Sequence, residues 1–228
     1  MTILALDTAT EFFEAALGTQ NGNFSFELDV GMRHSELLLE AVDHLLKISG
    51  TAKEDIDLFA CFRGPGSFTG LRIGFAAVKG LCLALSKSYI SVPTLDCIGE
   101  PFSGFEGIVV PVLDARQRRF YSALYRGGKK ISDYLDVCGE DLSAIIAQNS
   151  SENCDIMLCG NAAQIALPLI RQNMECRRVF ADPLCETGHA NLMLKYIKKS
   201  NTIKEGMDDF SSSPLYIRKS DAENQLRK

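Results

Sequence analysis

The chain has 228 residues, of which 46% are hydrophobic and 23% are charged, a composition typical of a globular protein with a sizeable core. The formal net charge of −5 argues against a non-specific grip on nucleic-acid phosphates, so any such contact has to be local or shared with a partner. Residues 1–7 carry no basic segment and no apolar stretch long enough for a signal peptide or a membrane span, which predicts a cytoplasmic protein.

The cysteines favour a reducing compartment as well. None of the eight cysteines forms a Cys-x-x-Cys pair, and several lie within apolar runs such as residues 81–83. Buried free thiols explain this pattern better than disulfides or a zinc site do.

The first half of the chain alternates between short apolar runs and two longer segments with helical spacing of apolar residues. The expected strands are residues 3–6, 12–17, 24–28, 57–62 and 89–93, and the expected helices are residues 34–48 and 70–85. The first three strands follow one another through short turns, so we expect an antiparallel meander with the helices packed on it.

A glycine-rich loop, residues 63–74, joins the fourth strand to the second helix. It contains four glycines and two hydroxyl side chains, Gly64, Gly66, Gly70, Gly74, Ser67 and Thr69. Glycine permits close approach of backbone, and the hydroxyls can accept hydrogen bonds from the free amides of a first helical turn. Such a loop either holds an anion at the helix N-terminus or acts as a structural elbow.

Two nucleotide-binding motifs fail at this loop. A Walker A motif needs Gly-Lys-Ser/Thr after a glycine and four further residues, and no lysine follows Gly64 or Gly66 at that spacing. A dinucleotide fingerprint needs a third glycine where Thr69 stands. We therefore interpret the loop as an elbow that aims the second helix outward, where another helix packs on it.

The second half of the chain repeats the pattern of the first. At a constant offset of 107 residues, Asp7 matches Asp114 and Phe13 matches Phe120, and the turn at residues 127–129 corresponds to the one at residues 21–23. The later expected elements are helices at residues 142–148, 162–172 and 188–199 and strands at residues 155–159 and 177–180.

This order predicts a duplicated α/β fold of the actin-like (ASKHA, ribonuclease H-like) type. The two similar subdomains are expected at residues 1–101 and 102–228, and whether the tail at residues 220–228 packs back on the first stays open. By fold analogy alone, the ends of the two first strands face a shared cleft. The predicted cleft residues are Asp7, Thr8, Asp114 and Arg116.

Motifs along the whole chain resemble those of the TsaB family, also called YeaZ. They lie at residues 3–10, 34–38, 64–74, 113–116 and 214–218, whereas residues 137–213 match only in general pattern. The resemblance implies a non-catalytic scaffold in the threonylcarbamoyl modification of the tRNA adenosine next to the anticodon. It implies a heterodimer with the catalytic subunit TsaD and assembly with the ATPase TsaE, and these partners hold the ATP/ADP and the metal.

The residues are compatible with a chain that binds neither cofactor alone. The related enzyme's metal site depends on two histidines four residues apart, and here Leu38 stands four residues after His34. One imidazole is too few for a transition-metal site, and His44 and His189 complete no spaced motif. Asp7 and Asp114 could hold magnesium, but no glycine loop for phosphate follows either of them, so we predict no cofactor bound by this chain alone.

The two helices of the first half are the predicted partner interface, because the second is apolar over more of its circumference than one sheet contact requires. The predicted contact residues are His34, Leu37, Leu38, Ala41, Leu45, Arg72, Phe75, Ala76 and Lys79. The alternative is that both helices are simply core. Without TsaD, the same surface is expected to form a twofold homodimer.

Contact with tRNA is expected through the complex, with a basic hairpin as the possible direct site. Its residues are Arg118, Arg119, Lys129 and Lys130, together with Arg116 and Arg126; Lys198, Lys199, Lys204, Arg227 and Lys228 are equally ambiguous. No interleaved aromatic residues indicate base stacking, so a solvated face is the alternative. Other functions also stay open: a stand-alone actin-like kinase or metallopeptidase-like hydrolase, and a homodimeric binding module.

Overall fold

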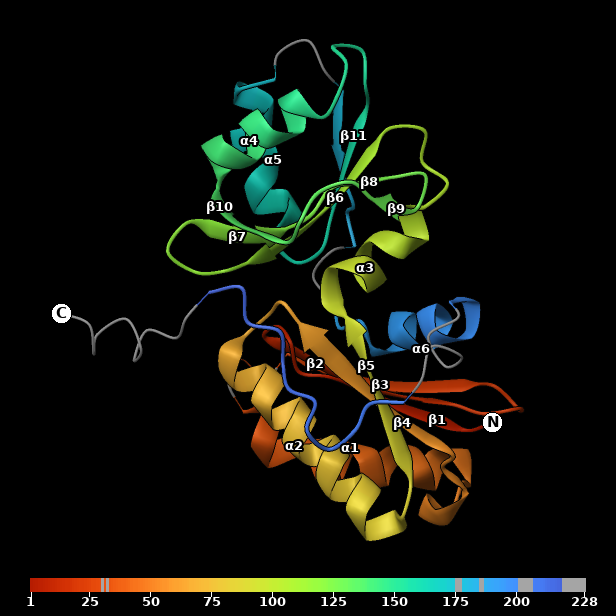
Figure 1. Ribbon diagram of the computed structural model, residues 1–228. Helices are drawn as coiled ribbons and strands as arrows, with labels where there is room; N and C mark the ends of the chain where they lie inside the picture. The colour runs from red at the N-terminus through yellow and green to blue at the C-terminus, as the bar shows by residue number, and fades with distance from the viewer. Residues whose placement is uncertain (30, 32, 175–177, 185–186, 201–206, 219–228) are drawn as a thin grey trace, which may run out of the picture. The chain divides into compact units, whose positions relative to one another are not determined.

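The computed structural model describes residues 1–218 apart from residues 30, 32, 175–177, 185–186 and 201–206 (Figure 1). The chain divides into two compact units: Met1–Cys97 with Thr187–Leu215, and Ile98–Glu186 with residues 216–218. The predicted boundary after residue 101 lies within a few residues of the observed boundary after Cys97. The expectation of a continuous second subdomain was wrong, because Thr187–Leu215 returns to the first unit; residues 220–228 lie outside the described residues.

The first unit is built on a five-stranded sheet in which all five expected strands form. They are β1 (Ile3–Asp7), β2 (Phe12–Gly18), β3 (Asn23–Asp29), β4 (Leu58–Gly64) and β5 (Ser88–Pro93). The order is β3-β2-β1-β4-β5, with β1, β2 and β3 antiparallel and β1, β4 and β5 parallel. Helices α1 (His34–Ser49), α2 (Phe68–Leu85) and α6 (Ala190–Lys199) pack on it.

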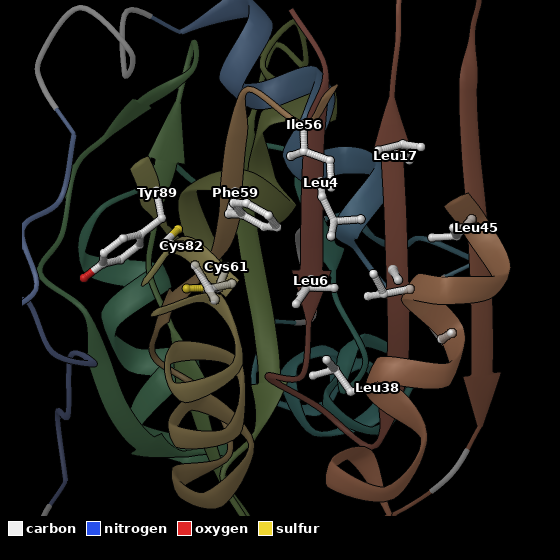
Figure 2. Close-up of a cluster of buried hydrophobic side chains, with 14 of the residues drawn as sticks. Leu4, Leu6, Leu17, Leu38, Leu45, Ile56, Phe59, Cys61, Cys82 and Tyr89 are labelled. Atoms are coloured by element: carbon white, nitrogen blue, oxygen red, sulfur yellow. The ribbon is translucent and has the colours of Figure 1, made fainter. Parts of the chain in front are cut away.

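Alternation along β1 explains why this sheet needs helices on both faces. Leu4 and Leu6 pack with residues of α1 and α2 in one hydrophobic cluster, part of which Figure 2 shows. Ile3 and Ala5 point to the opposite face and pack in a second cluster with residues of α6. The central strand is therefore buried on both sides, and the returning helix α6 supplies the second cover.

The second unit repeats this sheet. Its strands are β6 (Ile108–Asp114), β7 (Arg119–Ser122), β10 (Leu135–Cys138), β11 (Ile156–Cys159) and β12 (Val179–Ala181), with helices α4 (Gly139–Gln148) and α5 (Ala163–Gln172). The order β10-β7-β6-β11-β12 has the same strand directions as the first sheet. The predicted duplication is confirmed at the level of the sheets.

One detail of the predicted repeat was wrong. The turn at residues 127–129 does not join the second and third strands of the repeat; it joins the short strands β8 (Tyr125–Arg126) and β9 (Lys129–Lys130), which branch from β6. The counterpart of β3 is β10, which comes later in the chain. The helix α3 (Thr94–Gly99) and the short 3₁₀ helices η1 (Lys53–Asp55) and η2 (Glu100–Phe102) complete the described elements.

The described cysteines are free thiols, four of them buried. Burial raises the pKa of the Cys82 thiol to about 11 and also raises the pKa of Cys61. A thiol with a raised pKa is a poor nucleophile at neutral pH, so these two are core residues. Cys176 and Cys185 lie outside the described residues.

Candidate partner interface

The glycine-rich loop packs against the end of β1 within the first unit, a contact that the sequence-based interpretation did not include. A Cβ atom on Gly70 would lie 1.9 Å from the Thr8 carbonyl oxygen, and one on Gly74 would lie 2.6 Å from Thr8 Oγ1. The Thr8 hydroxyl donates a 2.7 Å hydrogen bond to the Gly70 carbonyl. Both glycines are therefore present because the first turns of α2 pack directly on the β1–β2 turn.

The amides near this contact are already used by the chain itself. Ser67 caps α2 by accepting from the Gly70 amide at 3.2 Å, as predicted, and its own amide donates to the Ala9 carbonyl at 2.7 Å. The Ala9 amide donates to Asp7 Oδ1 at 2.8 Å. A phosphate at a helix N-terminus needs free amides, and the amides of Gly70, Ser67 and Ala9 are not free.

Asp7 belongs to a row of three carboxylates that holds the returning helix. In the strand register, Asp7 of β1 lies opposite Glu14 of β2, and Glu14 lies opposite Glu27 of β3. Amides at the start of α6 donate to this row: His189 to Asp7 (2.8 Å), Asn191 to Glu14 (3.2 Å) and Gly188 to Glu27 (3.0 Å). Negative side chains at a helix N-terminus are stabilising, and this row explains why α6 belongs to the first unit.

The same arrangement changes the acidity of Glu14. Burial raises the pKa of this carboxyl above its ordinary value, and the negative charges of Asp7 and Glu27 raise it further, against the opposing effect of the Asn191 amide. Asp7 has no exposed surface, and His189 Nδ1 lies 3.4 Å from its Oδ2. Asp7 is thus fully engaged within its own unit.

His34 begins α1, as predicted, and is buried. Its Nε2 lies 2.8 Å from the Thr10 carbonyl oxygen, and its ring is 6.2 Å from that of Phe13. Leu38, one turn later, lies in the hydrophobic core. Among the described residues, no group of three His, Cys, Asp or Glu side chains is arranged to hold a metal ion.

Most of the predicted interface residues on these helices lie in the core. Five of them are buried within the first unit, namely His34, Leu38, Ala41, Leu45 and Phe75. Their prediction as contact residues was wrong, because a buried side chain cannot meet a partner while the unit stays folded. Leu37 is half-buried against the same core.

The outer face of α2 remains apolar and exposed. Arg72 and Ala76 are exposed as predicted, and so are Gly80, Leu83 and Ala84, which lie on the side away from the buried Val78 and Cys82. Leu83 is 69% exposed, and a Cβ atom on Gly80 would meet nothing within 4 Å. We call Ala76, Gly80, Leu83 and Ala84 the outer face of α2.

By length and composition alone, α2 is also long and apolar enough to cross a membrane, and it is the one such helix among the described residues. A core helix of a soluble protein passes the same test, but such a helix is mostly buried, whereas a third of α2 is buried. Because α2 is apolar and mostly not buried within its unit, we expect another molecule to cover its outer face.

Lys79, another predicted contact residue, is engaged within its own chain. Its ammonium donates to the carbonyl oxygens of Phe210 at 2.9 Å and Ser212 at 2.6 Å. The sequence could not show this, because the two segments are more than 130 residues apart.

The other two predicted cleft residues, Asp114 and Arg116, lie in the second unit at the end of β6. The Arg116 amide donates to Asp114 Oδ1 at 2.7 Å, and the guanidinium lies 3.7 Å from the same carboxylate. The end of β6 thus repeats the turn that Asp7 forms with Ala9 at the end of β1. A shared cleft stays a prediction.

The basic residues predicted on one hairpin lie on two. Arg116 and Arg118 are exposed in the turn between β6 and β7, whereas Lys129 and Lys130 lie on the β8–β9 hairpin. The first turn follows the end of β6, while β8 pairs with β6 near its beginning, so the two groups lie toward opposite ends of that strand.

Arg119 begins β7, and its side chain is bound to β10, because its Nε donates to Asp136 Oδ1 at 2.7 Å. That carboxylate raises the pKa of the guanidinium, and Arg119 is therefore a structural ion pair. Lys130 lies 3.6 Å over the ring of Tyr134. Lys204, Arg227 and Lys228 lie outside the described residues.

Comparison with known proteins agrees with this geometry. A model of the TsaD family, tRNA N6-adenosine threonylcarbamoyltransferase, matches residues 29–223. The tRNA threonylcarbamoyladenosine biosynthesis protein TsaB of Escherichia coli K12 is 39% identical over 131 residues, which are 55% of each chain. TsaB of Bacillus subtilis 168 is 32% identical over 127 residues, 55% of this chain and 56% of the relative. The chain thus spans about half the length of the curated relatives that it matches.

Solved structures extend the likeness. YeaZ from Pseudomonas aeruginosa has a TM-score of 0.77 and 26% identity, covering 95% of this chain and 99% of that one. A Bacteroides thetaiotaomicron protein with an actin-like ATPase fold has a TM-score of 0.51 and 11% identity, covering 85% and 95%, and supports the fold alone. Together with the repeated sheet, these likenesses define a duplicated actin-like α/β protein. The chain belongs to the TsaD family and, with the relatives named above, to its TsaB (YeaZ) proteins.

Proposed function

We propose that this chain is a non-catalytic, activating subunit for threonylcarbamoyl modification of tRNA adenosine, acting as a heterodimer with TsaD and together with TsaE. The observation that carries the proposal is the outer face of α2. This surface is apolar and exposed on a helix whose other side is fixed in a packed core. The relatives are named for tRNA threonylcarbamoyladenosine biosynthesis, which suggests the pathway. The outer face of α2 suggests that this chain acts in that pathway by binding a partner protein.

The outer face suits a helix as its partner. Ala76, Gly80 and Leu83 recur at spacings of four and three residues, so they form one stripe along the helix. Because two of the three are small, another helix axis can approach closely. Of the two charged residues of α2, Arg72 lies one turn before Ala76 and continues this stripe toward the start of the helix, whereas the Lys79 ammonium is engaged by the carbonyls of Phe210 and Ser212. Without TsaD, we expect the stripe to pair with that of a second copy.

The proposed lack of catalysis rests on how the end of β1 is used. Glycine-loop amides serve the capping of α2 and the β1–β2 turn, and Asp7 accepts from Ala9 and His189. We therefore assign ATP/ADP and metal to the partner subunits, tRNA to the whole complex, and the complex to the cytoplasm. The outer face of α2 is assigned to protein and not to membrane.

A reconstitution experiment tests this division of roles. TsaD, TsaE, ATP, tRNA and an activated threonylcarbamoyl donor are combined with and without this chain, and threonylcarbamoyladenosine is measured on the tRNA. We expect product formation to depend on the chain, and the chain alone to hydrolyse no ATP. ATP or peptide turnover by the isolated chain would instead support the stand-alone kinase or hydrolase.

The interface is tested with a matched pair of substitutions. Ala76→Glu places a charge on the outer face, whereas Ala144→Glu places the same charge on an exposed alanine of α4 in the second unit. A buried unpaired charge costs about 2–5 kcal/mol at an interface, so only Ala76→Glu is expected to stop co-elution with TsaD. Equal co-elution of both variants would show that the outer face is not the contact.

A further inference from the structure

Residues 207–215 form an extended segment along β5 and α2, drawn in blue beside α2 in Figure 1, and we call this segment the strap. Its first contact is with the sheet. Asp208 forms a bridge with Tyr89 of β5, its amide donating to the Tyr89 carbonyl at 3.0 Å, and its carboxylate accepts from the Ser91 amide. β5 is the last strand in its sheet order, so the strap covers an otherwise open edge.

The second contact is with the middle of α2. The Lys79 ammonium bridges two strap carbonyls, those of Phe210 and Ser212, and lies 5.6 Å from the ring of Phe75. Hydrogen bonds from a charged donor are stronger than neutral ones. This lysine therefore ties α2 to the strap.

Aromatic rings continue the same contact. The ring of Tyr89 lies edge-on to Phe75 of α2 at 6.2 Å and to Phe210 of the strap at 6.0 Å. The Tyr89 hydroxyl donates to the Asp209 carbonyl at 2.7 Å. Tyr89 thus joins the helix, the sheet edge and the strap, with a polar tip and an apolar ring serving different partners.

The third contact is at the start of the glycine-rich loop. The Leu215 amide donates to the Arg63 carbonyl at 2.7 Å. Gly64 has a φ of +112°, and a Cβ atom there would lie 2.7 Å from the Leu215 carbonyl oxygen. Only glycine fits this position, so the entry to α2 is shaped to hold the strap.

We infer that the strap sets the position of α2 for partner docking, with Lys79 as the positioning residue and not a contact residue. Contacts at Arg63, Lys79 and Tyr89 hold the helix from its entry to its middle, on a side other than the outer face. The inference rests on the proposed function, because it assumes that the outer face meets TsaD. Loosening the strap lowers the affinity for the partner without changing the outer face.

Amide hydrogen exchange of the isolated chain tests the first half of the inference. Lys79→Met keeps the apolar stem and removes the ammonium, and we expect the Asp208 and Leu215 amides to exchange at least about 10-fold faster. Lys79→Arg restores donors and is expected to restore protection. Lys195→Met, at an exposed lysine of α6, is the matched control and is expected to leave these amides unchanged.

Titration with TsaD tests the second half. We expect Lys79→Met to bind about 10-fold more weakly than the wild type, with wild-type affinity in Lys79→Arg and Lys195→Met. The inference is overturned if Lys79→Met exchanges like the wild type, or if it loses protection yet binds TsaD equally well. Neither result affects the proposed function. A wild-type chain that fails to bind TsaD overturns the proposed function, and with it the docking role of the strap.

Discussion

Glu14 lies between Asp7 and Glu27 on three adjacent strands, where its carboxylate accepts a hydrogen bond from the Asn191 amide at the start of α6. Burial and the two neighbouring carboxylates raise its pKa. A carboxyl group with a raised pKa in the folded state stabilises the fold fully below its ordinary pKa of 4.5, and this contribution is lost as the pH rises through the folded value.

Glu14→Gln is therefore expected to increase the free energy of unfolding at pH 7, because glutamine keeps an acceptor for Asn191 and removes the buried charge. The gain should shrink as the pH falls toward 4.5, because the raised pKa lets Glu14 in the folded wild type take up its proton above pH 4.5. Urea unfolding at both pH values measures the difference, with Glu40→Gln on the exposed side of α1 as the control. A gain that does not change with pH would mean that the charge of Glu14 is not its cause.

Residue patterns predicted local helix structure better than they predicted which side chains are free to contact a partner. Ser67 and Thr69 were both predicted to cap α2, and the cap is Ser67, whereas Thr69 lies within the helix. His34 and Leu38 were predicted as one turn of α1, and both predictions follow from local spacing. Spacing cannot separate an apolar residue that faces its own sheet from one that faces a partner. Leu38 and Leu45 were therefore predicted as interface and lie in the core.

At the scale of elements, α2 carries glycines with opposite roles. A Cβ atom on Gly70 would collide with the Thr8 backbone at 1.9 Å, whereas Gly80 faces open space. Gly70→Ala is expected to lower the free energy of unfolding by about 3 kcal/mol, since backbone has to shift. Gly80→Ala should raise it by about 0.5–1 kcal/mol, because alanine is the better helix former. Denaturant midpoints of the two variants measure this, and equal effects would contradict the assigned packing.

The strands and helices with strong periodicity were predicted within a few residues, and the exceptions have local causes. β10 has four residues, all half-buried, so it lacks a clear alternation. The β8–β9 hairpin has the glycine turn that the repeat led us to expect elsewhere. The strap has no periodic pattern, and its position depends on partners such as Lys79 and Arg63 that are far away in the sequence.

At the scale of the whole molecule, the duplication was predictable and the course of the chain was not. The repeat predicted an aspartate at the end of β1 and at the end of β6, and the structure adds that each accepts a hydrogen bond from an amide two residues later. The return of Thr187–Leu215 to the first unit depends on carboxylates in three strands meeting amides at the start of α6. These hydrogen bonds join residues more than 160 positions apart, so no local sequence pattern predicts them.

The central claim is that this chain acts through a partner that covers the outer face of α2. Gly80→Glu tests it most directly, because a side chain at Gly80 meets nothing in the isolated chain and the fold is expected to remain intact. Calorimetric titration of TsaD into the wild-type chain should show binding, and the variant should bind at least about 30-fold more weakly. A folded Gly80→Glu variant with wild-type affinity for TsaD would contradict the account.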